Sequence, residues 1–179
     1  MKQLILGGAR SGKSRLAERL ALQSGLEVTY IATASAGDAE MQQRIQHHRD
    51  RRPSHWHLVE EPLALAQVLQ QHAGHLNLLL VDCLTLWLSN LICLEQPAEL
   101  QRQREALLTV LPTLPGQIIL VSNEVGMGIV PMGALSRQFQ DEMGLLQQRV
   151  AACCERVVLT VAGLPHVLKP AGTFLKIED

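Results

Sequence analysis

The chain has 179 residues, 47% of them hydrophobic, and a net charge of −1. This length predicts one domain over 1–179, with 170–179 expected to be a loosely ordered tail, and the hydrophobic content excludes a disordered protein. A balanced charge and only 3% aromatic residues argue against nucleic-acid binding. No apolar run approaches the roughly 20 residues needed to span a bilayer, so we expect no integral membrane segment and a cytoplasmic location.

Short apolar runs alternate along the chain with longer segments of helical periodicity. The runs predict buried strands at Gln3–Leu6, Val28–Ala32, Leu76–Val81, Ile118–Val121 and Val157–Val161. The periodic segments predict helices over Lys13–Gln23, Ala39–Asp50, Leu63–His72, Leu84–Leu94, Ala98–Leu111 and Ala134–Cys154. This alternation predicts an α/β fold with a mostly parallel sheet and helices on both faces. Ligands of such sheets bind beyond the carboxyl ends of the strands.

A glycine-rich segment follows the first predicted strand. It reads G-x-x-x-x-G-K-S and consists of Gly7, Gly8, Ala9, Arg10, Ser11, Gly12, Lys13 and Ser14. Its backbone N–H groups can point at phosphate oxygens, Lys13 can reach the β- and γ-phosphates, and Ser14 can ligate Mg²⁺. The strand before it and the helix after it favour a phosphate-binding P-loop, and hence a P-loop NTPase-like (RecA-like) fold, over a glycine turn that binds nothing.

Asp82 ends the apolar strand LNLLLV. A P-loop protein needs a carboxylate at the end of another strand to hold the metal, directly or through water. The alternative is that Asp82 caps the helix that follows it, and one aspartate can do both. Together these features predict a protein that transfers phosphoryl groups from a Mg²⁺–nucleotide.

The segment RIQHHRDRRP, residues 44–53, places two histidines among four arginines. One interpretation is a solvated helix end whose cations complement the helix dipole. The other is a phosphate-handling arm, in which arginines hold triphosphate oxygens and one histidine attacks phosphorus or carries a proton. The sequence pattern alone leaves both open.

Polar residues also follow the later strands. In SHWHLVEE, we expect a short extended segment with Trp56 inward and the two flanking histidines outward. Glu60 and Glu61 either cap the next helix or bind a base or ribose. Asn123 and Glu124, in SNEVGMGIVP, are the polar groups best placed to meet a substrate, with Glu124 a candidate general base; the alternative is a connecting loop.

Taken together, these motifs resemble one family. The segments GGARSGKSRLAE, YIATA, DAEMQQRIQHH, RRPSHW, LLLVDCLTLWLSNL, SNEVGMGIVP and VAGLPHVLK are similar to the bifunctional adenosylcobinamide kinase / adenosylcobinamide-phosphate guanylyltransferase family over about residues 3–169. The resemblance implies phosphorylation of adenosylcobinamide by GTP or ATP. It then implies transfer of GMP from GTP through a guanylylated histidine, giving adenosylcobinamide-GDP and pyrophosphate. It also implies Mg²⁺ and a homotrimer. The alternative is a single-activity P-loop small-molecule kinase.

The resemblance also assigns residues. The family pattern R-I-x-x-H falls on Arg44, Ile45 and His48, so His48 and Lys13 are the implied catalytic residues, with the adjacent His47 as the alternative nucleophile. The implied nucleotide contacts are the P-loop together with Ala32, Thr33, Ala34, Arg49, Asp50, Arg51, Arg52, Glu60 and Asp82.

Overall fold

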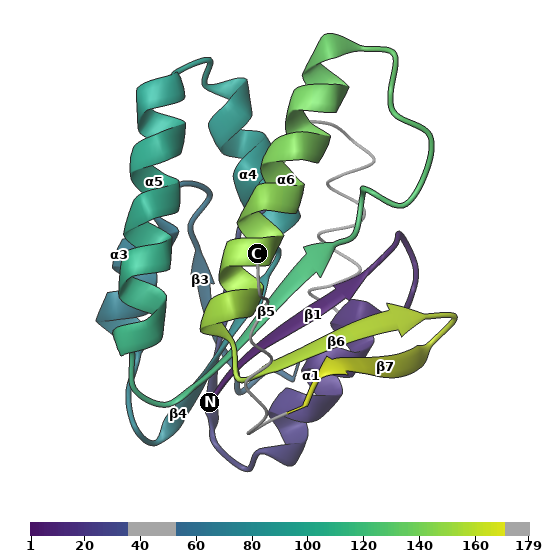
Figure 1. The fold of residues 1–179 in the computed structure, drawn as a ribbon. Helices are drawn as coiled ribbons and strands as arrows, with labels where there is room; N and C mark the ends of the chain where they lie inside the picture. Colours follow the sequence, from purple (N-terminus) through teal and green to yellow (C-terminus); the bar gives the residue numbers. More distant parts are fainter. Residues whose placement is uncertain (36–52, 171–179) are drawn as a thin grey trace.

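The computed structural model describes residues 1–35 and 53–170. The strands of this part form one sheet in the order β3-β2-β4-β5-β1-β6-β7 (Figure 1). Neighbouring strands are parallel throughout except for β6 and β7, which pair antiparallel. The strands are β1 (Lys2–Gly7), β2 (Glu27–Ala32), β3 (His57–Glu60), β4 (Asn77–Asp82), β5 (Gln117–Asn123), β6 (Arg156–Val161) and β7 (Leu164–Lys169).

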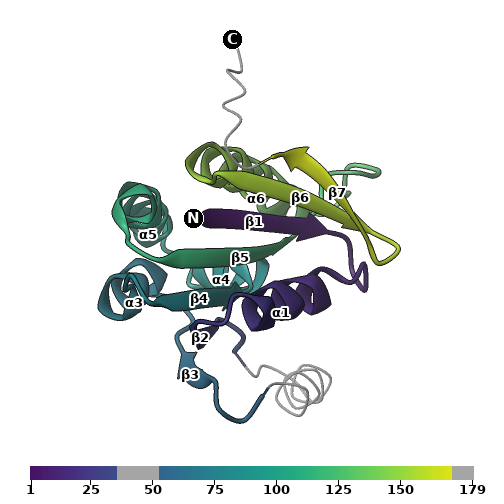
Figure 2. The same ribbon diagram turned by 90° about the horizontal axis from the view of Figure 1, so that it is seen from below.

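Helices cover both faces of the sheet (Figures 1 and 2). One face packs against α1 (Lys13–Gln23), and the other against α3 (Leu65–His72), α4 (Leu84–Cys93), α5 (Pro97–Val110) and α6 (Ala134–Cys153). A 3₁₀ turn, η1 (Leu111–Thr113), ends α5. The predicted mostly parallel, two-faced architecture is therefore confirmed, and the helix predicted over Ala39–Asp50 lies outside the described residues.

The central strands are apolar on both sides because both of their faces are buried. On β1, Leu4 packs into the layer that contains α4 and α6, while the next residue, Ile5, packs into the layer that contains α1. Both are fully buried. Since neither face meets water, these strands read as continuous apolar runs rather than as alternating ones. The apolar runs located the central strands to within a few residues of their observed ends, and the helical periodicity did the same for the described helices.

The two strands at the edges of the sheet, β3 and β7, were not fully predicted from the sequence. Of the extended segment expected around Trp56, only His57–Glu60 is a strand, β3, and residues 54–56 form a turn and a bend before it. Trp56 is buried and the two flanking histidines are exposed, as expected. Strand β7 was not predicted. Five of its six residues are exposed, so it carries no buried run. It follows β6 through a two-residue turn, Ala162 and Gly163, in which both φ angles are positive (51° and 79°), the conformation of a tight hairpin turn.

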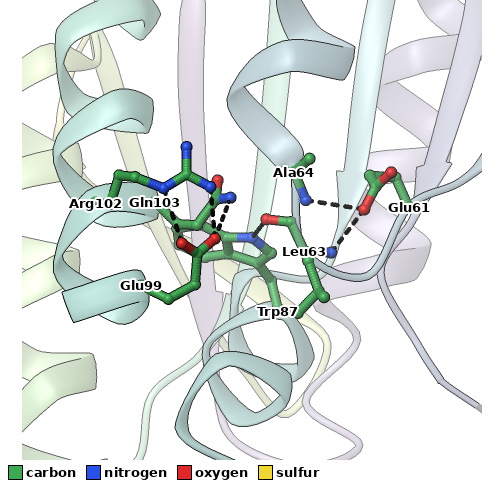
Figure 3. Close-up of polar contacts among 7 residues, drawn as sticks. All are labelled: Glu61, Leu63, Ala64, Trp87, Glu99, Arg102 and Gln103. Atoms are coloured by element: carbon green, nitrogen blue, oxygen red, sulfur yellow. Dashed lines mark hydrogen bonds and ion pairs between the residues drawn. The ribbon is translucent and has the colours of Figure 1, made fainter. Parts of the chain in front are cut away.

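Helix α3 begins two residues later than predicted. The carboxylate of Glu61 accepts hydrogen bonds from the backbone N–H groups of Leu63 and Ala64, each at 2.8 Å (Figure 3). These bonds close a separate turn before the helix starts at Leu65. No helix within residues 1–35 and 53–170 is both long enough and apolar enough to cross a bilayer.

Candidate nucleotide-binding site

The strand register brings the predicted site residues to one edge of the sheet. Gly7 of β1 pairs with Asn123 on one side and Thr160 on the other. Ala32 of β2 pairs with Asp82 and Glu60. We call the ends of β1, β5 and β6 the P-loop half, and the ends of β2, β3 and β4 the carboxylate half. Both halves lie at the carboxyl ends of parallel strands, where ligands of open α/β sheets bind.

The P-loop half needs glycine at two positions. A methyl group at Gly7 would lie 2.3 Å from Ser11 Oγ and 2.6 Å from the carbonyl oxygen of Thr160. Gly12 has φ 96° at the N-cap of α1, and its carbonyl accepts the first helical bond, from Leu16 N–H, at 2.9 Å. Side chains are excluded at Gly7 by contact and disfavoured at Gly12 by backbone conformation. The loop therefore curls tightly into the helix N-terminus, which is a ready anion-binding site.

Backbone hydrogen bonds hold the P-loop from both neighbouring strand ends. The N–H of Glu124, just after β5, donates to the carbonyl of Gly7 at 3.1 Å, and the N–H of Gly163, in the β6–β7 turn, donates to the carbonyl of Ser11 at 2.9 Å. Within the loop, Ser11 N–H donates to Gly8 O at 3.2 Å. Gly8 and Arg10 are exposed, so the outer rim of this fixed loop stays open to a ligand.

Lys13 begins α1 and folds back over the loop. Its ammonium donates to the carbonyl of Gly8 at 3.2 Å. Burial lowers the pKa of Lys13, and the nearby carboxylate of Asp82 opposes that shift. The ammonium is thus partly desolvated between the loop and a carboxylate, where the charge of a phosphate would stabilise its protonated form.

The donor set fits Mg²⁺. Ser14, in the first turn of α1, supplies a hydroxyl, and Asp82 supplies a carboxylate from the end of β4; oxygen is the ligand atom that Mg²⁺ prefers. No group of three or more His, Cys, Asp or Glu side chains in the described residues is arranged to hold a metal by itself. Mg²⁺ is usually bound by one or two protein ligands together with substrate phosphates, so Ser14 and Asp82 are the residues that would share it with a nucleotide.

The carboxylate of Asp82 does not cap α4, so that alternative is wrong. The N-cap of α4 is Cys83, and no side chain makes a capping hydrogen bond there. Instead, Oδ2 of Asp82 accepts a hydrogen bond from the hydroxyl of Tyr30 at 3.2 Å. The peptide bond from Asp82 to Cys83 is cis.

Thr33 is fully buried, and its hydroxyl joins β2 to the start of α4. The hydroxyl donates to the carbonyl of Cys83 at 2.7 Å and accepts from the N–H of Cys83 at 2.9 Å. Asn90 extends this link by donating to the carbonyls of Thr33 and Pro62, at 2.8 and 3.1 Å. The flanking Ala32 and Ala34 are half-buried. The hydroxyl of Thr33 therefore makes its hydrogen bonds within the protein, and Ala32 and Ala34 are the residues of this segment that can contact a ligand.

The structure separates the roles of the two adjacent glutamates. Glu61 closes the turn before α3, and Trp87 fixes the same turn by donating its indole N–H to the carbonyl of Leu63 at 2.8 Å (Figure 3). Glu60 ends β3, is exposed, and pairs in register with Ala32. Neither glutamate caps α3, because its N-cap is Ala64 and no side chain makes a capping hydrogen bond there. Glu61 instead holds the turn before the helix, and Glu60 lies at the end of β3 beside Ala32.

Asn123 and Glu124, the two residues predicted to face substrate, make different hydrogen bonds within the protein. The carboxylate of Glu124 accepts hydrogen bonds from the N–H groups of Gly126 and Met127, at 2.6 and 3.1 Å, within its own loop. Asn123 is half-buried, and its backbone is fixed by Thr85 and Gln147. Both residues lie beside Gly7, as their place after β5 predicts.

The histidine-bearing segment falls outside the described residues. This applies to His47 and His48 and to the predicted nucleotide contacts Arg49, Asp50, Arg51 and Arg52. The chain is described again from Pro53, and three residues later the ring of Trp56 stacks on that of Tyr30, with centroids 6.4 Å apart.

A large pKa shift elsewhere has a different origin. On α5, Glu99 has its pKa lowered to about 2, first by the hydrogen bond from Arg102 and then by that from Gln103 (Figure 3). These side chains form an ion-pair cluster on a helix surface, and such pairs contribute little to stability. We therefore assign this shift to local pairing and not to a catalytic site.

Three parts of the site were not predicted from the sequence: the hydroxyl of Tyr30, the Thr33–Cys83 link and the docking of the Gly163 turn on the P-loop. For Tyr30 a signal existed, because a tyrosine within an apolar strand needs a partner for its hydroxyl. For the other two, the partners lie 50 and 152 residues apart in the chain, and no local pattern indicates them.

Comparison with known proteins decides the family. The family model described as cobinamide kinase / cobinamide phosphate guanyltransferase matches residues 3–168. The chain belongs to this family. It is 63% identical, over 94% of its length and 98% of the relative's, to the bifunctional adenosylcobalamin biosynthesis protein CobP of Pseudomonas aeruginosa. It is 38% identical, over 94% of its length and all of the relative's, to the bifunctional adenosylcobalamin biosynthesis protein CobU of Escherichia coli K12. The family and enzyme class implied by the sequence motifs are thereby confirmed.

Solved structures confirm the fold. Flagellar accessory protein FlaH of Methanocaldococcus jannaschii matches with a TM-score of 0.53 and 16% identity, over 98% of this chain and 82% of that one. An ATPase of a type III secretion system matches with a TM-score of 0.58 and 11% identity, over 93% and 56%. At such identities the likeness shows the fold alone, which is that of P-loop NTPases with a RecA-like sheet.

Proposed function

We propose that this chain catalyses both family reactions at the edge formed by the two halves. The first transfers the γ-phosphoryl group of GTP or ATP to the hydroxyl of adenosylcobinamide. The second transfers GMP from GTP to the resulting phosphate and releases pyrophosphate. The observation that carries the proposal is the P-loop. It is fixed by backbone bonds from both sides, with Lys13 over its carbonyls and Asp82 facing it from β4.

In the kinase step, the chain's part is to bind and orient the triphosphate. N–H groups of the loop and the ammonium of Lys13 hold phosphate oxygens, and Ser14 and Asp82 are the residues that would hold Mg²⁺. The cation, when bound with the nucleotide, offsets the negative charge that builds up on the transferred group. We place Asn123 and Glu124 on the acceptor side, because the N–H of Glu124 is bonded to the first residue of the loop.

In the second step, we propose His48 as the nucleophile. An imidazole nitrogen of His48 attacks the α-phosphorus of GTP, a N–P bond forms, and the bond to the β-phosphate oxygen breaks with pyrophosphate as the leaving group. A phosphate oxygen of the acceptor then attacks the same phosphorus and the N–P bond breaks. Arg49, Arg51 and Arg52 would offset the charge of the pyrophosphate, and Asp50, Glu60, Ala32 and Ala34 complete the proposed nucleotide contacts, with Thr33 holding that segment in place through Cys83.

Labelling with GTP tests this step. Purified protein is incubated with Mg²⁺ and GTP labelled at the α-phosphorus, then denatured, and label on the polypeptide is tested for acid lability and alkali stability. We expect such label in the wild type and in His47→Asn, and none in His48→Asn, which should still phosphorylate adenosylcobinamide. Label lost only in His47→Asn would move the nucleophile to His47. No label in the wild type, with GTP shown to bind, would favour the single-activity kinase.

We also propose a cytoplasmic homotrimer. The family resemblance implies the trimer, and the segment after β5 offers apolar surface for it. Ile129 and Met132 in this segment are 96% and 98% exposed, and burying large apolar side chains against another copy would be favourable. The cytoplasm is the compartment that supplies GTP and ATP.

A further inference from the structure

Strand β2 brings a tyrosine to the carboxylate half that no motif of the sequence singled out. The ring of Tyr30 is 4% exposed, and its hydroxyl donates to Oδ2 of Asp82 at 3.2 Å. We propose that Tyr30 is a positioning residue that sets the orientation of the Asp82 carboxylate for the cation. This inference rests on the metal-binding role of Asp82 in the proposed function.

The sheet register explains why the hydroxyl reaches this carboxylate. Ala32 of β2 pairs with Asp82 of β4, and Tyr30 lies two residues before Ala32. Because side chains two residues apart share a face of a strand, Tyr30 and Asp82 point to the same side. That side is the one covered by α1, since Tyr30 packs in the cluster that contains Leu16 and Ala17. Lys13 and Ser14 begin that same helix.

The ring itself is held in place, so the hydroxyl is directed before a cation binds. Trp56 stacks on Tyr30 with an interplanar angle of 27°, and Trp56 is also buried. A ring packed in this way has little rotational freedom, and its hydroxyl loses little entropy on bonding to a carboxylate. Because Tyr30 engages Oδ2, the orientation of the carboxylate is set within the protein itself.

The backbone of the same residue is fixed from β2 as well. The N–H of Thr33 donates to the carbonyl of Asp82 at 3.4 Å, and the hydroxyl of Thr33 bonds both polar backbone groups of Cys83. The carboxylate is thus held from Tyr30 of β2, and the backbone from Thr33, the residue that follows β2. Removing a group that hydrogen-bonds a metal-ligating carboxylate in this way typically lowers metal affinity 10–100-fold.

The test is Tyr30→Phe, which removes the hydroxyl and keeps the ring. Mn²⁺ stands in for Mg²⁺, and its binding to the protein with a non-hydrolysable GTP analogue is measured by electron paramagnetic resonance. We expect Mn²⁺ to bind about 10-fold more weakly. In kinase assays the Mg²⁺ concentration for half-maximal rate should rise, and kcat should recover at saturating Mg²⁺. Thr29→Val is the matched control, because it removes a buried hydroxyl from the neighbouring position of β2, on the opposite face; its Mn²⁺ affinity should equal that of the wild type.

A double-mutant cycle with Asp82→Asn separates this inference from the function on which it rests. Asp82→Asn should weaken Mn²⁺ binding, and adding Tyr30→Phe to it should cause no further loss. If Asp82→Asn weakens binding and Tyr30→Phe does not, the positioning role is overturned while the proposed function stands. If Asp82→Asn leaves Mn²⁺ binding unchanged, the metal role of Asp82 fails, and the positioning role fails with it. Thermal melts of each variant show whether the fold is retained.

Discussion

The two halves of the site are built from different chemical groups. In the P-loop half, the holding bonds run between backbone atoms: Glu124 N–H to Gly7 O and Gly163 N–H to Ser11 O. In the carboxylate half, side chains make the corresponding bonds: Tyr30 to Asp82 and Thr33 to Cys83. The P-loop itself is therefore held by backbone bonds, whereas Asp82 and Cys83 are held by buried side chains in addition to the backbone bond from Thr33 to Asp82.

This difference follows from the charge that each half has to receive. Phosphate oxygens are anionic and are bound by N–H groups, which the backbone supplies wherever glycine lets it curl. A cation needs oxygen ligands with charge, which only a side chain supplies, and that side chain must be held in one orientation. The backbone bonds that hold the P-loop therefore do not depend on the identity of the side chains of the residues that make them, whereas the bonds of the carboxylate half are lost when single buried side chains are substituted.

The largest effect we expect is from Lys13→Ala, which removes the ammonium that lies over the P-loop. Kinase turnover should fall about 10²–10³-fold, the usual consequence of losing one charge stabiliser in an active site. The melting temperature should not fall in parallel, because burial of the ammonium opposes its charged form in the free protein. Steady-state kinetics and thermal melts measure the two effects. Unchanged turnover would contradict the P-loop assignment.

The pH dependence of binding sharpens this prediction. The pKa of Lys13 is lowered by burial in the free protein, and a bound phosphate should raise it. Above the free-protein pKa, binding must therefore take up a proton, so nucleotide affinity should fall as the pH rises through that pKa. Calorimetry with a GTP analogue at increasing alkaline pH should show this fall in the wild type and not in Lys13→Ala.

The next largest effect should come from the carboxylate half. Thr33→Val keeps the shape of the side chain but leaves the buried N–H and carbonyl of Cys83 without the hydroxyl that now bonds them. The cost of such unpaired groups is about 1–3 kcal/mol, which should lower the melting temperature by several degrees. Thr33→Ser retains the hydroxyl and should recover most of the loss. Equal destabilisation by both variants would show that packing of the methyl group, and not the hydrogen bonds, holds this junction.

The same contrast explains how much was predictable from the sequence. The motif of the P-loop half was recognisable from the sequence because it is local: Gly7 and Gly12 stand five residues apart, followed by Lys13 and Ser14, between an apolar run and a helical period. The docking of the Gly163 turn on this loop was not predicted. Asp82 was located by the same reasoning, as the polar end of a buried strand. Its partner Tyr30 was not, because that pairing depends on the register between β2 and β4, 52 residues apart in the chain.

The edge strand β7 was not predicted from the sequence for a related reason. Burial on both faces produces the continuous apolar runs that predict β1, β4 and β5, whereas β7 is exposed along most of its length. Its presence is indicated only by the turn at Ala162 and Gly163. That turn matters for function, since the N–H of Gly163 bonds the P-loop. A contact between backbone groups leaves no side-chain pattern in the sequence.

The smallest effect we expect distinguishes two adjacent glutamates. Glu61→Ala removes the acceptor of two N–H groups in the turn before α3 and should cost about 1 kcal/mol of stability, because those groups lose their hydrogen-bond partner, with affinity for a GTP analogue unchanged. Glu60→Ala, one residue earlier and on the ligand edge, should weaken binding of the analogue. Thermal melts and calorimetry on both variants measure the two quantities. The opposite outcome, in which Glu61→Ala weakens binding and Glu60→Ala does not, would place the nucleotide on the side of α3. It would mean that the carboxylate half contacts its ligand through the turn before α3 and not through the end of β3.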